Sequence, residues 1–238
     1  MRLNKYIAQN SEFSRRKVDE FVTRKLVFVN GKLATLGMDV TEKDDIKISG
    51  IEIRKSDNLV YYALNKPAGV VSTVSDEQDR SKVTDFVPDN PTVYPAGRLD
   101  LNSEGLIILT NDGEFTNELT HPSNQHEKEY LVKCIIQKSK FKPTDQNLKF
   151  VSKQMLKGIK IDGKKMIADK VDVSAINDSM IKIQIVIHTG YNRQVRKMCD
   201  KMDLEVIKLK RIRIGKLSLE KLDLRPGEYK SVKREAIL

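Results

Sequence analysis

The sequence contains no tryptophan and is poor in residues that build disulfide frameworks or zinc sites. Only two cysteines occur in 238 residues, Cys134 and Cys199, and neither belongs to a C-x-x-C pair. Such sparse thiols exclude a disulfide scaffold and indicate a reducing compartment, which we expect to be the cytoplasm. His121 and His126 have no second ligand pair at finger-like spacing, so we interpret them as loop residues and expect no metal site.

Long apolar runs are missing as well. Residues 1–6 have no signal-peptide core, and every apolar run is far shorter than a membrane span. The chain also has neither a Walker motif nor a dinucleotide-binding glycine motif. We therefore expect a soluble protein that has no membrane partner and no small-molecule cofactor, and we expect it to be a monomer.

Positive charge is what the sequence has in excess. The formal net charge is +10, which favours an anionic partner, with nucleic acid as the leading candidate. Residues 1–32 hold eight basic residues against three acidic ones, and residues 190–216 hold nine against three. A basic surface can also serve solubility alone, so the charge by itself does not decide the function.

Residues 1–50 are predicted to form a small separate module of two helices followed by a sheet. Apolar residues at helical spacing begin at Leu3, and Ser14 is placed to cap a second helix. The expected strands are Leu26–Val29, Thr35–Val40 and Ile46–Ile48.

The helical pair of this module carries its positive charge. Basic side chains at the start of a helix suit phosphate groups, because the helix N-terminus adds its own partial positive charge. An ordinary solvated helix face is the alternative. The candidate RNA-binding residues here are Arg2, Lys5, Arg15, Arg16 and Lys17.

The same module resembles the S4 RNA-binding domain. The resemblance rests on Arg2–Ala8, Ser14–Arg16 and Val27–Lys32, and it spans nearly the whole module. It implies an RNA-binding role for these residues.

Residues 51–58 are polar and are expected to be a linker to a second domain, residues 59–238. Many predicted strands with few interleaved helices indicate an α+β domain, in which helices flank a mainly antiparallel mixed sheet. The principal strands expected are Leu59–Pro67, Leu106–Leu109, Lys128–Ile136, Ile167–Val173, Met180–His188, Leu204–Ile207 and Lys208–Ile214, and the helices are 114–119, 143–153 and 193–202.

The loop from Gly97 to Gly105 is the strongest candidate for an active site. It carries Asp100 and leads into a short apolar run that is typical of a buried strand. A carboxylate on a loop that a buried strand supports is a common catalytic arrangement. The alternative is that Arg98 and Asp100 pair on an ordinary surface turn.

Three further patterns accompany this loop. They are His126–Tyr130, which has an aromatic residue at the head of a strand, the loop and basic helix Gly190–Cys199, and the basic strand Lys208–Gly215. Basic residues this dense, in a domain that also holds an acidic loop, favour a groove that binds phosphates. The candidate RNA contacts are Arg98, Arg193, Lys210, Arg211 and Arg213.

Together these residues resemble the pseudouridine synthases of the small-subunit/large-subunit ribosomal RNA family. The matching motifs are Gly97–Asp100 with Ser103 and Gly105, Ala63–Pro67, Gly69–Thr73, His126–Val132 and Asn192–Arg196. Within the family the chain most resembles the pseudouridine synthase F branch, which acts on 23S ribosomal RNA. The resemblance implies a ribosomal RNA substrate and no cofactor.

The resemblance also implies roles for three residues. Asp100 would be the catalytic carboxylate near C1′ of a flipped-out uridine, acting either as a nucleophile or as a base at C2′. Arg196 would keep it ionised, and Tyr130 would pack on the uracil and help to remove the C5 proton. Arg98 is placed to fill the gap that the flipped base leaves.

Three alternative functions remain open at this point. One is a non-catalytic RNA-binding ribosome-assembly factor, and another is a synthase acting on 16S rRNA or tRNA. The third is a retaining glycosidase that uses Asp100 and Glu104, because both chemistries attack an anomeric carbon. A chain with net charge +10 and no tryptophan to stack sugars argues against the glycosidase.

Overall fold

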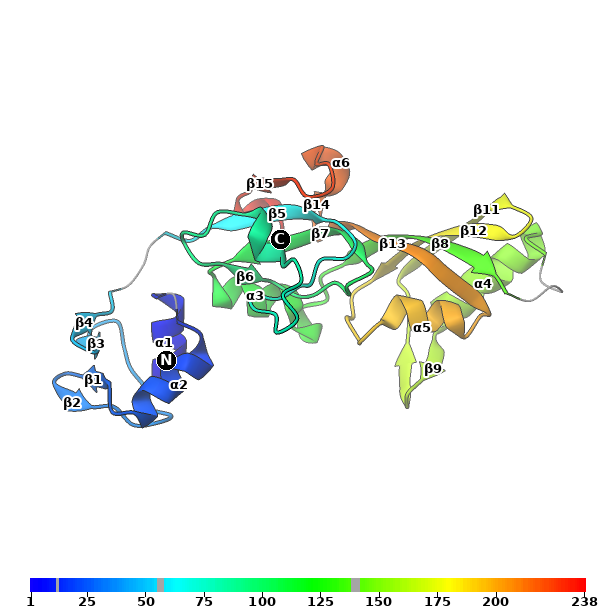
Figure 1. Ribbon diagram of the computed structural model, residues 1–238. Coiled ribbons are helices and arrows are strands. Elements are labelled where there is room, and N and C mark those ends of the chain that lie inside the picture. The colour runs from blue at the N-terminus through cyan, green and yellow to red at the C-terminus, as the bar shows by residue number, and fades with distance from the viewer. Residues whose placement is uncertain (12, 55–57, 138–141) are drawn as a thin grey trace.

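The computed structural model describes residues 1–11, 13–54, 58–137 and 142–238. It contains a small N-terminal domain and an elongated C-terminal domain built on one long, twisted sheet (Figure 1). In the described part of the chain, no helix is both long and apolar enough to cross a membrane.

The N-terminal domain has the predicted order of two helices followed by a sheet. Its elements are α1 (Leu3–Gln9), α2 (Arg15–Thr23), β1 (Val27–Val29), β2 (Lys32–Leu33), β3 (Ile46–Ile48) and β4 (Ile51–Glu52), with strand order β2-β1-β3-β4. Ser14 caps α2 as predicted, because its hydroxyl oxygen accepts a hydrogen bond from the Lys17 backbone N–H at 3.2 Å.

Two expectations for this domain are wrong. Residues 35–40 form no strand: Gly37 turns the chain with φ of +77°, and the Val40 N–H donates to the Met1 carbonyl at 2.7 Å instead of to a sheet. The expected linker also starts too early, because β4 pairs with β3 and Ile53 is buried in the core of this domain. Residues 55–57 of that linker lie outside the described residues.

The C-terminal domain contains the following strands and helices. The strands are β5 (Tyr61–Lys66), β6 (Tyr94–Pro95), β7 (Glu104–Thr110), β8 (Lys128–Ile136), β9 (Ile159–Ile161), β10 (Lys164–Met166), β11 (Lys170–Asn177), β12 (Met180–Ile187), β13 (Leu204–Ile214), β14 (Leu217–Ser218) and β15 (Tyr229–Ser231). The helices are α3 (Gly113–Thr120), α4 (Asp145–Lys157), α5 (Gln194–Asp200) and α6 (Leu219–Leu222), with 3-10 turns η1 (Val83–Phe86), η2 (Pro122–Asn124) and η3 (Arg234–Ala236).

The main sheet has the order β11-β12-β8-β13-β7-β5-β15, and of these neighbours only β13 and β7 run parallel among the described residues. The predicted mainly antiparallel mixed sheet is therefore confirmed. The two strands expected at 204–207 and 208–214 are one strand, β13, which continues through a bulge between Val206 and Lys208. A bulge inserts one residue and bends the strand without ending it.

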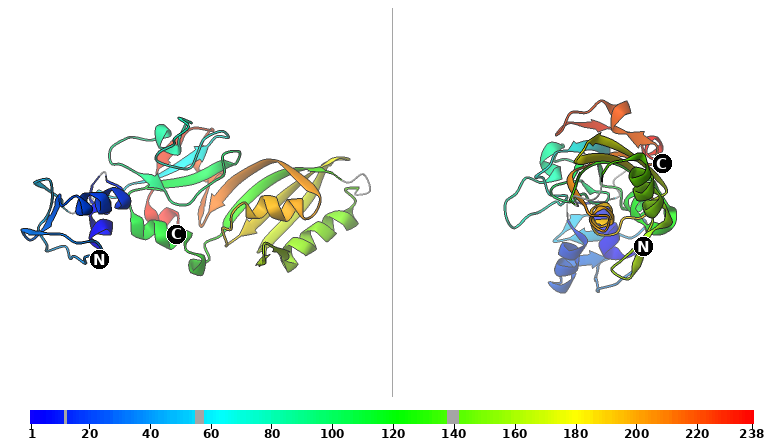
Figure 2. Two further views of the ribbon diagram at one scale, coloured as in Figure 1. Left: turned by 60° about the horizontal axis from the view of Figure 1, so that its bottom comes forward. Right: turned by 90° about the vertical axis from the view of Figure 1, so that its right-hand side faces the viewer.

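The helices cover both faces of this sheet. α4 and α5 lie on one face (Figure 2), where they bury the isoleucines at alternate positions of β12, the strand that the sequence predicted at Met180–His188. α3 and α6 pack on the opposite face, over β5 and β7. Cys134 and Cys199, 65 residues apart, meet in the core under α5 as free thiols with their sulfurs 3.9 Å apart.

Candidate active site

A pocket of about 320 Å³ opens where the loop between β6 and β7 meets β8, β13 and the N-terminus of α5. Its lining includes Asp100 and Tyr130, which come from separate parts of the sequence and which the motifs singled out. Basic and polar side chains also line it, namely Arg98, Ser103, Lys128, Arg193, Gln194 and Arg211. The volume is at the small end of ligand pockets, which suits one group the size of a nucleobase.

The Asp100 loop is held at residues on both sides of the aspartate. The Ser72 hydroxyl donates to the Leu99 carbonyl at 2.8 Å and accepts from the Leu99 N–H at 3.1 Å. On the other side of Asp100, the Gly69 N–H donates to the Leu101 carbonyl at 2.9 Å. These bonds use the loop backbone and leave the carboxylate free for chemistry.

A buried lysine at the end of β5 reinforces the same loop. The Lys66 ammonium donates to the carbonyls of Val70 at 2.7 Å, Pro67 at 2.9 Å and Leu101 at 3.3 Å. Burial lowers the pKa of Lys66 to about 8, although Glu104 and Asp100 oppose this shift. Lys66 therefore joins three loop carbonyls beneath the catalytic candidate.

Gly105 permits the parallel contact between β7 and β13. A Cβ on this residue would lie 2.1 Å from the carbonyl oxygen of Arg211, and its φ of +105° is one that other residues rarely adopt. The glycine thus lets β13 approach the base of the loop, which brings the Arg211 side chain into the pocket.

Two arginines face the Asp100 carboxylate. Arg193 Nη1 lies 3.7 Å and Arg196 Nε lies 3.8 Å from its Oδ2, while Arg98 forms no ion pair with it among the described contacts. The surface-turn alternative is therefore wrong about the partner. The Asp100 side chain lines the pocket and is 32% exposed, so its carboxylate is accessible from the pocket.

Arg196 does more than supply charge. Its Nη2 donates to the Asn102 carbonyl at 3.0 Å and to the Ser103 hydroxyl at 3.2 Å, and these bonds connect α5 to the Asp100 loop. Burial lowers the pKa of this guanidinium, and the nearby Arg193 lowers it further.

Tyr130 occupies the opposite side of the pocket. It lies on β8, is 8% exposed, and is paired across the sheet with Ile185 of β12 and Arg211 of β13. Strand pairing on both sides fixes the position of the ring, so Tyr130 can present a fixed surface to a base that enters the pocket.

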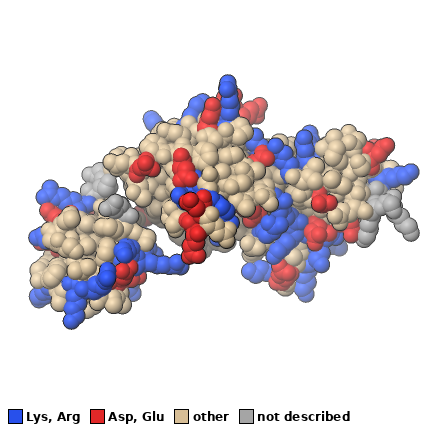
Figure 3. Space-filling view, viewed as in Figure 1, with Lys and Arg blue, Asp and Glu red and all other residues tan. Residues whose placement is uncertain are grey.

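The predicted RNA contacts of the N-terminal domain lie at its surface. Arg15 and Arg16 are exposed on α2, and Lys17 pairs with Glu20 on the same helix. Arg2 pairs with Asp39, and Lys5 reaches Glu114 of the C-terminal domain at 3.5 Å. Lys and Arg side chains also gather around α5 and the β9–β10 hairpin on the face shown in Figure 3.

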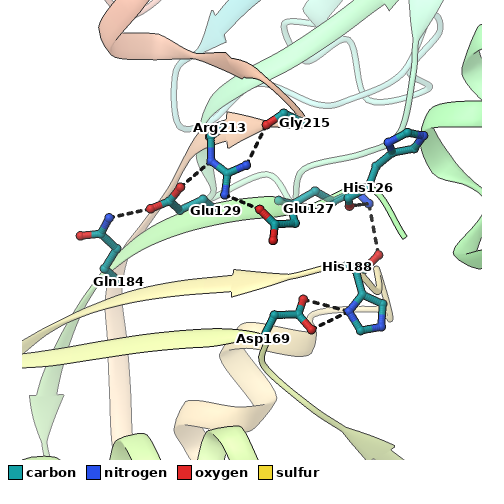
Figure 4. Close-up of polar contacts among 9 residues, drawn as sticks. His126, Glu127, Glu129, Asp169, Gln184, His188, Arg213 and Gly215 are labelled. Atoms are coloured by element: carbon teal, nitrogen blue, oxygen red, sulfur yellow. Dashed lines mark hydrogen bonds and ion pairs between the residues drawn. The ribbon is translucent and has the colours of Figure 1, made fainter. Parts of the chain in front are cut away.

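Two predicted RNA contacts on β13 need correction. Arg211 is only 3% exposed and points into the pocket, so it cannot lie along an RNA backbone. Arg213 is held between Glu129 at 2.6 Å and Glu127 at 2.9 Å (Figure 4), and these carboxylates already neutralise its charge. Strand alternation places both side chains partly inside the fold, which a count of basic residues does not reveal. Arg98, Arg193 and Lys210 remain candidates.

Several residues of the site were not predicted from the sequence. Lys66 and Ser72 fall within motifs that match the family, but the sequence analysis gave them no role. Lys128 and Gln194 lie close in the sequence to Tyr130 and Arg193, and they were given no role either. The available signal for Lys66 was a lysine directly before a proline at the end of the mainly apolar strand β5. The others show their function only when the pocket is assembled.

Comparison with known proteins identifies the family of each domain. Residues 60–201 match the RNA pseudouridylate synthase family, and residues 1–46 match the S4 domain. The chain belongs to the RNA pseudouridylate synthase family and is an enzyme that isomerises uridine in RNA.

Individual relatives extend this result over the whole chain. The chain is 40% identical over 240 residues to the Salmonella typhi dual-specificity RNA pseudouridine synthase RluF, covering 100% of this chain and 77% of the relative. It is 38% identical over 242 residues to the Bacillus subtilis ribosomal large subunit pseudouridine synthase B, covering 98% and 95%. A crystal structure of a pseudouridylate synthase superposes with a TM-score of 0.64 at 26% identity, covering 100% and 98%.

Proposed function

We propose that this enzyme converts a uridine of large-subunit (23S) ribosomal RNA to pseudouridine, with Asp100 as its catalytic carboxylate. The observation that carries the assignment of the site is that Asp100, Arg193 and Tyr130 line one base-sized pocket, and that Arg196 contacts the Asp100 carboxylate from outside the lining. The name of the B. subtilis relative, a ribosomal large subunit pseudouridine synthase, supports the substrate class, and the name of the S. typhi relative supports an RNA substrate. We also infer that it is a cytoplasmic monomer, in keeping with its free thiols.

The reaction breaks the N1–C1′ bond, turns the uracil and joins C5 to C1′. Asp100 supplies the carboxylate beside C1′, as a nucleophile or as a base at C2′, and Arg193 and Arg196 balance its charge. Tyr130 packs on the uracil and assists removal of the C5 proton. Arg98, exposed at the mouth of the pocket, fills the place of the flipped base in the RNA.

The glycosidase alternative does not fit the pocket. Glu104 pairs with Lys208 at 3.0 Å and is absent from the pocket lining, so it cannot serve as the second carboxylate beside Asp100.

Incubation with rRNA carrying tritium at C5 of uridine tests the proposal. Release of tritium is expected from 23S rRNA, whereas release only from 16S rRNA or tRNA would contradict the substrate class.

Tyr130→Phe should lower turnover much more than RNA affinity. The change keeps the buried ring and removes the hydroxyl, so a role in proton removal predicts a fall of about 10²-fold or more in kcat. Single-turnover tritium release and filter binding measure the two quantities. Near-normal turnover would reduce Tyr130 to a packing residue.

Deletion of residues 1–55 should weaken RNA binding and flatten its salt dependence. Fewer cationic contacts release fewer counterions, so the slope of log K against log salt should become smaller. The remaining chain should fold, because its two hydrophobic cores contain no residue of the N-terminal domain. An unchanged affinity and slope would show that this domain is not an RNA-binding arm.

A further inference from the structure

Arg211 has a donor group that the protein leaves unused. Its Nε donates to the Leu106 carbonyl at 2.6 Å, which fixes the guanidinium, but its Nη2 is buried with no hydrogen-bond partner among the described residues. The residue is only 3% exposed and lines the active-site pocket. An unpaired buried donor is costly, so this position is explained best by an acceptor that the substrate brings.

A second unused donor belongs to Gln194, which lines the same pocket. Its Oε1 accepts from the Thr189 hydroxyl at 2.8 Å and from the Tyr191 N–H at 3.2 Å. These two bonds fix the orientation of the amide, because only the oxygen can accept them. The Nε2 is then left buried and unpartnered in the described structure, on a residue that lines the pocket.

Lys128 adds a second positive charge to the pocket lining. We refer to Arg211, Gln194 and Lys128 together as the wall. It lies two residues before Tyr130 on β8, and its ammonium donates to the carbonyls of His126 at 3.0 Å and His188 at 3.4 Å. Burial and, to a smaller extent, the charge of Arg211 lower its pKa to about 8. Among the described contacts, neither cation has a carboxylate partner.

The chain connectivity of RNA decides which part of the substrate reaches this wall. A phosphodiester links two nucleotides, so it must stay where the RNA can enter and leave. The base is the only terminal part of a flipped nucleotide, and only it can reach side chains as buried as Arg211 and Gln194. Uracil offers two acceptors, O2 and O4, which match two unused donors.

We propose that Arg211 and Gln194, with Lys128 on the neighbouring strand β8, bind the two carbonyl oxygens of the target uracil and stabilise the charge that these oxygens gain during the reaction. This inference deepens the proposed function and rests on the pocket being the uridine site. Cytosine carries an amino group in place of O4. A donor of the protein would then face a second donor instead of an acceptor. The wall therefore also selects uridine over cytidine.

The chemistry gives this wall its catalytic effect. When N1–C1′ breaks, its electron pair stays on the uracil, and the negative charge spreads over N1, O2 and O4. When C5 bonds to C1′, the C5 proton leaves and N1 takes up a proton, so the base is neutral again. Fixed donors and cations at O2 and O4 stabilise the intermediate more than the neutral substrate.

Arg211→Met should lower single-turnover tritium release by about 10²- to 10³-fold, with RNA affinity changed far less. The diagnostic measurement uses RNA with 5-fluorouridine at the target, because fluorine makes uracil a more stable anion. In Arg211→Met, the rate of 5-fluorouridine consumption is measured by nuclease digestion and chromatography. The factor by which this rate falls should be at least about tenfold smaller than the factor by which the rate with uridine falls. Equal losses for both substrates would overturn the proposal.

Matched controls separate this result from failure of the fold or of the function. Arg225→Met removes an exposed arginine outside the pocket, and Lys133→Met removes an exposed lysine from the outer face of β8. Both should react like the unaltered enzyme. An unaltered enzyme that converts neither substrate would refute the proposed function itself. If Arg211→Met does not fold, Gln194→Met and Lys128→Met test the same wall with the same two substrates.

Lys128 provides a pH test. Its ammonium is charged below its pKa of about 8 and neutral above it, so turnover should fall as pH rises through about 8. Lys128→Arg keeps the charge and should weaken that alkaline limb. Arg98, Arg193, Arg211, Asp100, Tyr130 and Tyr191 also line the pocket, and Lys66, whose pKa is also about 8, holds the Asp100 loop and accounts for any part of the limb that remains. An alkaline limb in Lys128→Arg that equals that of the unaltered enzyme would contradict the role of Lys128.

Discussion

Asp100→Asn is expected to abolish pseudouridine formation, with a fall of at least about 10⁴-fold in single-turnover rate. Asparagine is nearly isosteric with aspartate, but it can act neither as a nucleophile nor as a base at C2′. Because both proposed mechanisms need the carboxylate, the prediction does not depend on which of them operates.

The fold and the RNA affinity of this variant should be close to normal. The loop is held by its backbone, through Ser72, Gly69 and Lys66, and the described contacts of the Asp100 side chain are only the two arginine pairs. Circular dichroism, thermal melting and filter binding provide the controls. Measurable turnover by a correctly folded Asp100→Asn enzyme would end the assignment of this pocket as the active site.

Arg196→Met should reduce turnover by about 10²- to 10³-fold, which is a larger loss than Arg193→Met should cause. Both guanidinium groups lie at similar distances from Asp100, but their surroundings differ. The Arg196 side chain is 13% exposed, against 51% for Arg193. Water screens the more exposed charge, so Arg193 has the weaker interaction with the carboxylate.

The bonds that Arg196 makes with the loop are the second reason for the difference. Without its Nη2, the Asn102 carbonyl and the Ser103 hydroxyl lose their donor, and the carboxylate is less firmly positioned against C1′. A displacement of about 1 Å at a reacting group is enough to cost about 10²-fold in rate. Single-turnover rates for Arg196→Met, Arg196→Lys and Arg193→Met measure the effect.

Arg196→Lys serves as the matched variant, since it keeps the charge and removes the planar fork. It should recover part of the loss but not all of it, because an ammonium cannot reproduce the geometry of both loop bonds. Equal effects of Arg193→Met and Arg196→Met would show that charge alone matters at this site. An active Arg196→Met enzyme would leave Arg193 as the partner of the aspartate.

The sequence by itself determined the local parts of this protein. Strands β8 and β12 follow from alternation of apolar residues, the start of α2 follows from the Ser14 cap, and the Asp100 loop follows from its glycines and the apolar run after it. These features depend on neighbours within a few residues, which is why pattern and propensity predict them. The motifs around Asp100 and Tyr130 also indicated the family, because each motif is a short continuous stretch of the chain.

Only the tertiary structure decided which side chains act together. Arg211 and Arg213 are two residues apart on one basic strand, and the sequence predicts the same role for both. Arg211 lines the same pocket as Asp100, whereas Arg213 is neutralised by two glutamates. The difference comes from the bulge between them and from β7 and β8 on either side of β13, which lie far away in the chain. Burial and ion pairing depend on such distant neighbours, and no local pattern of the sequence records them.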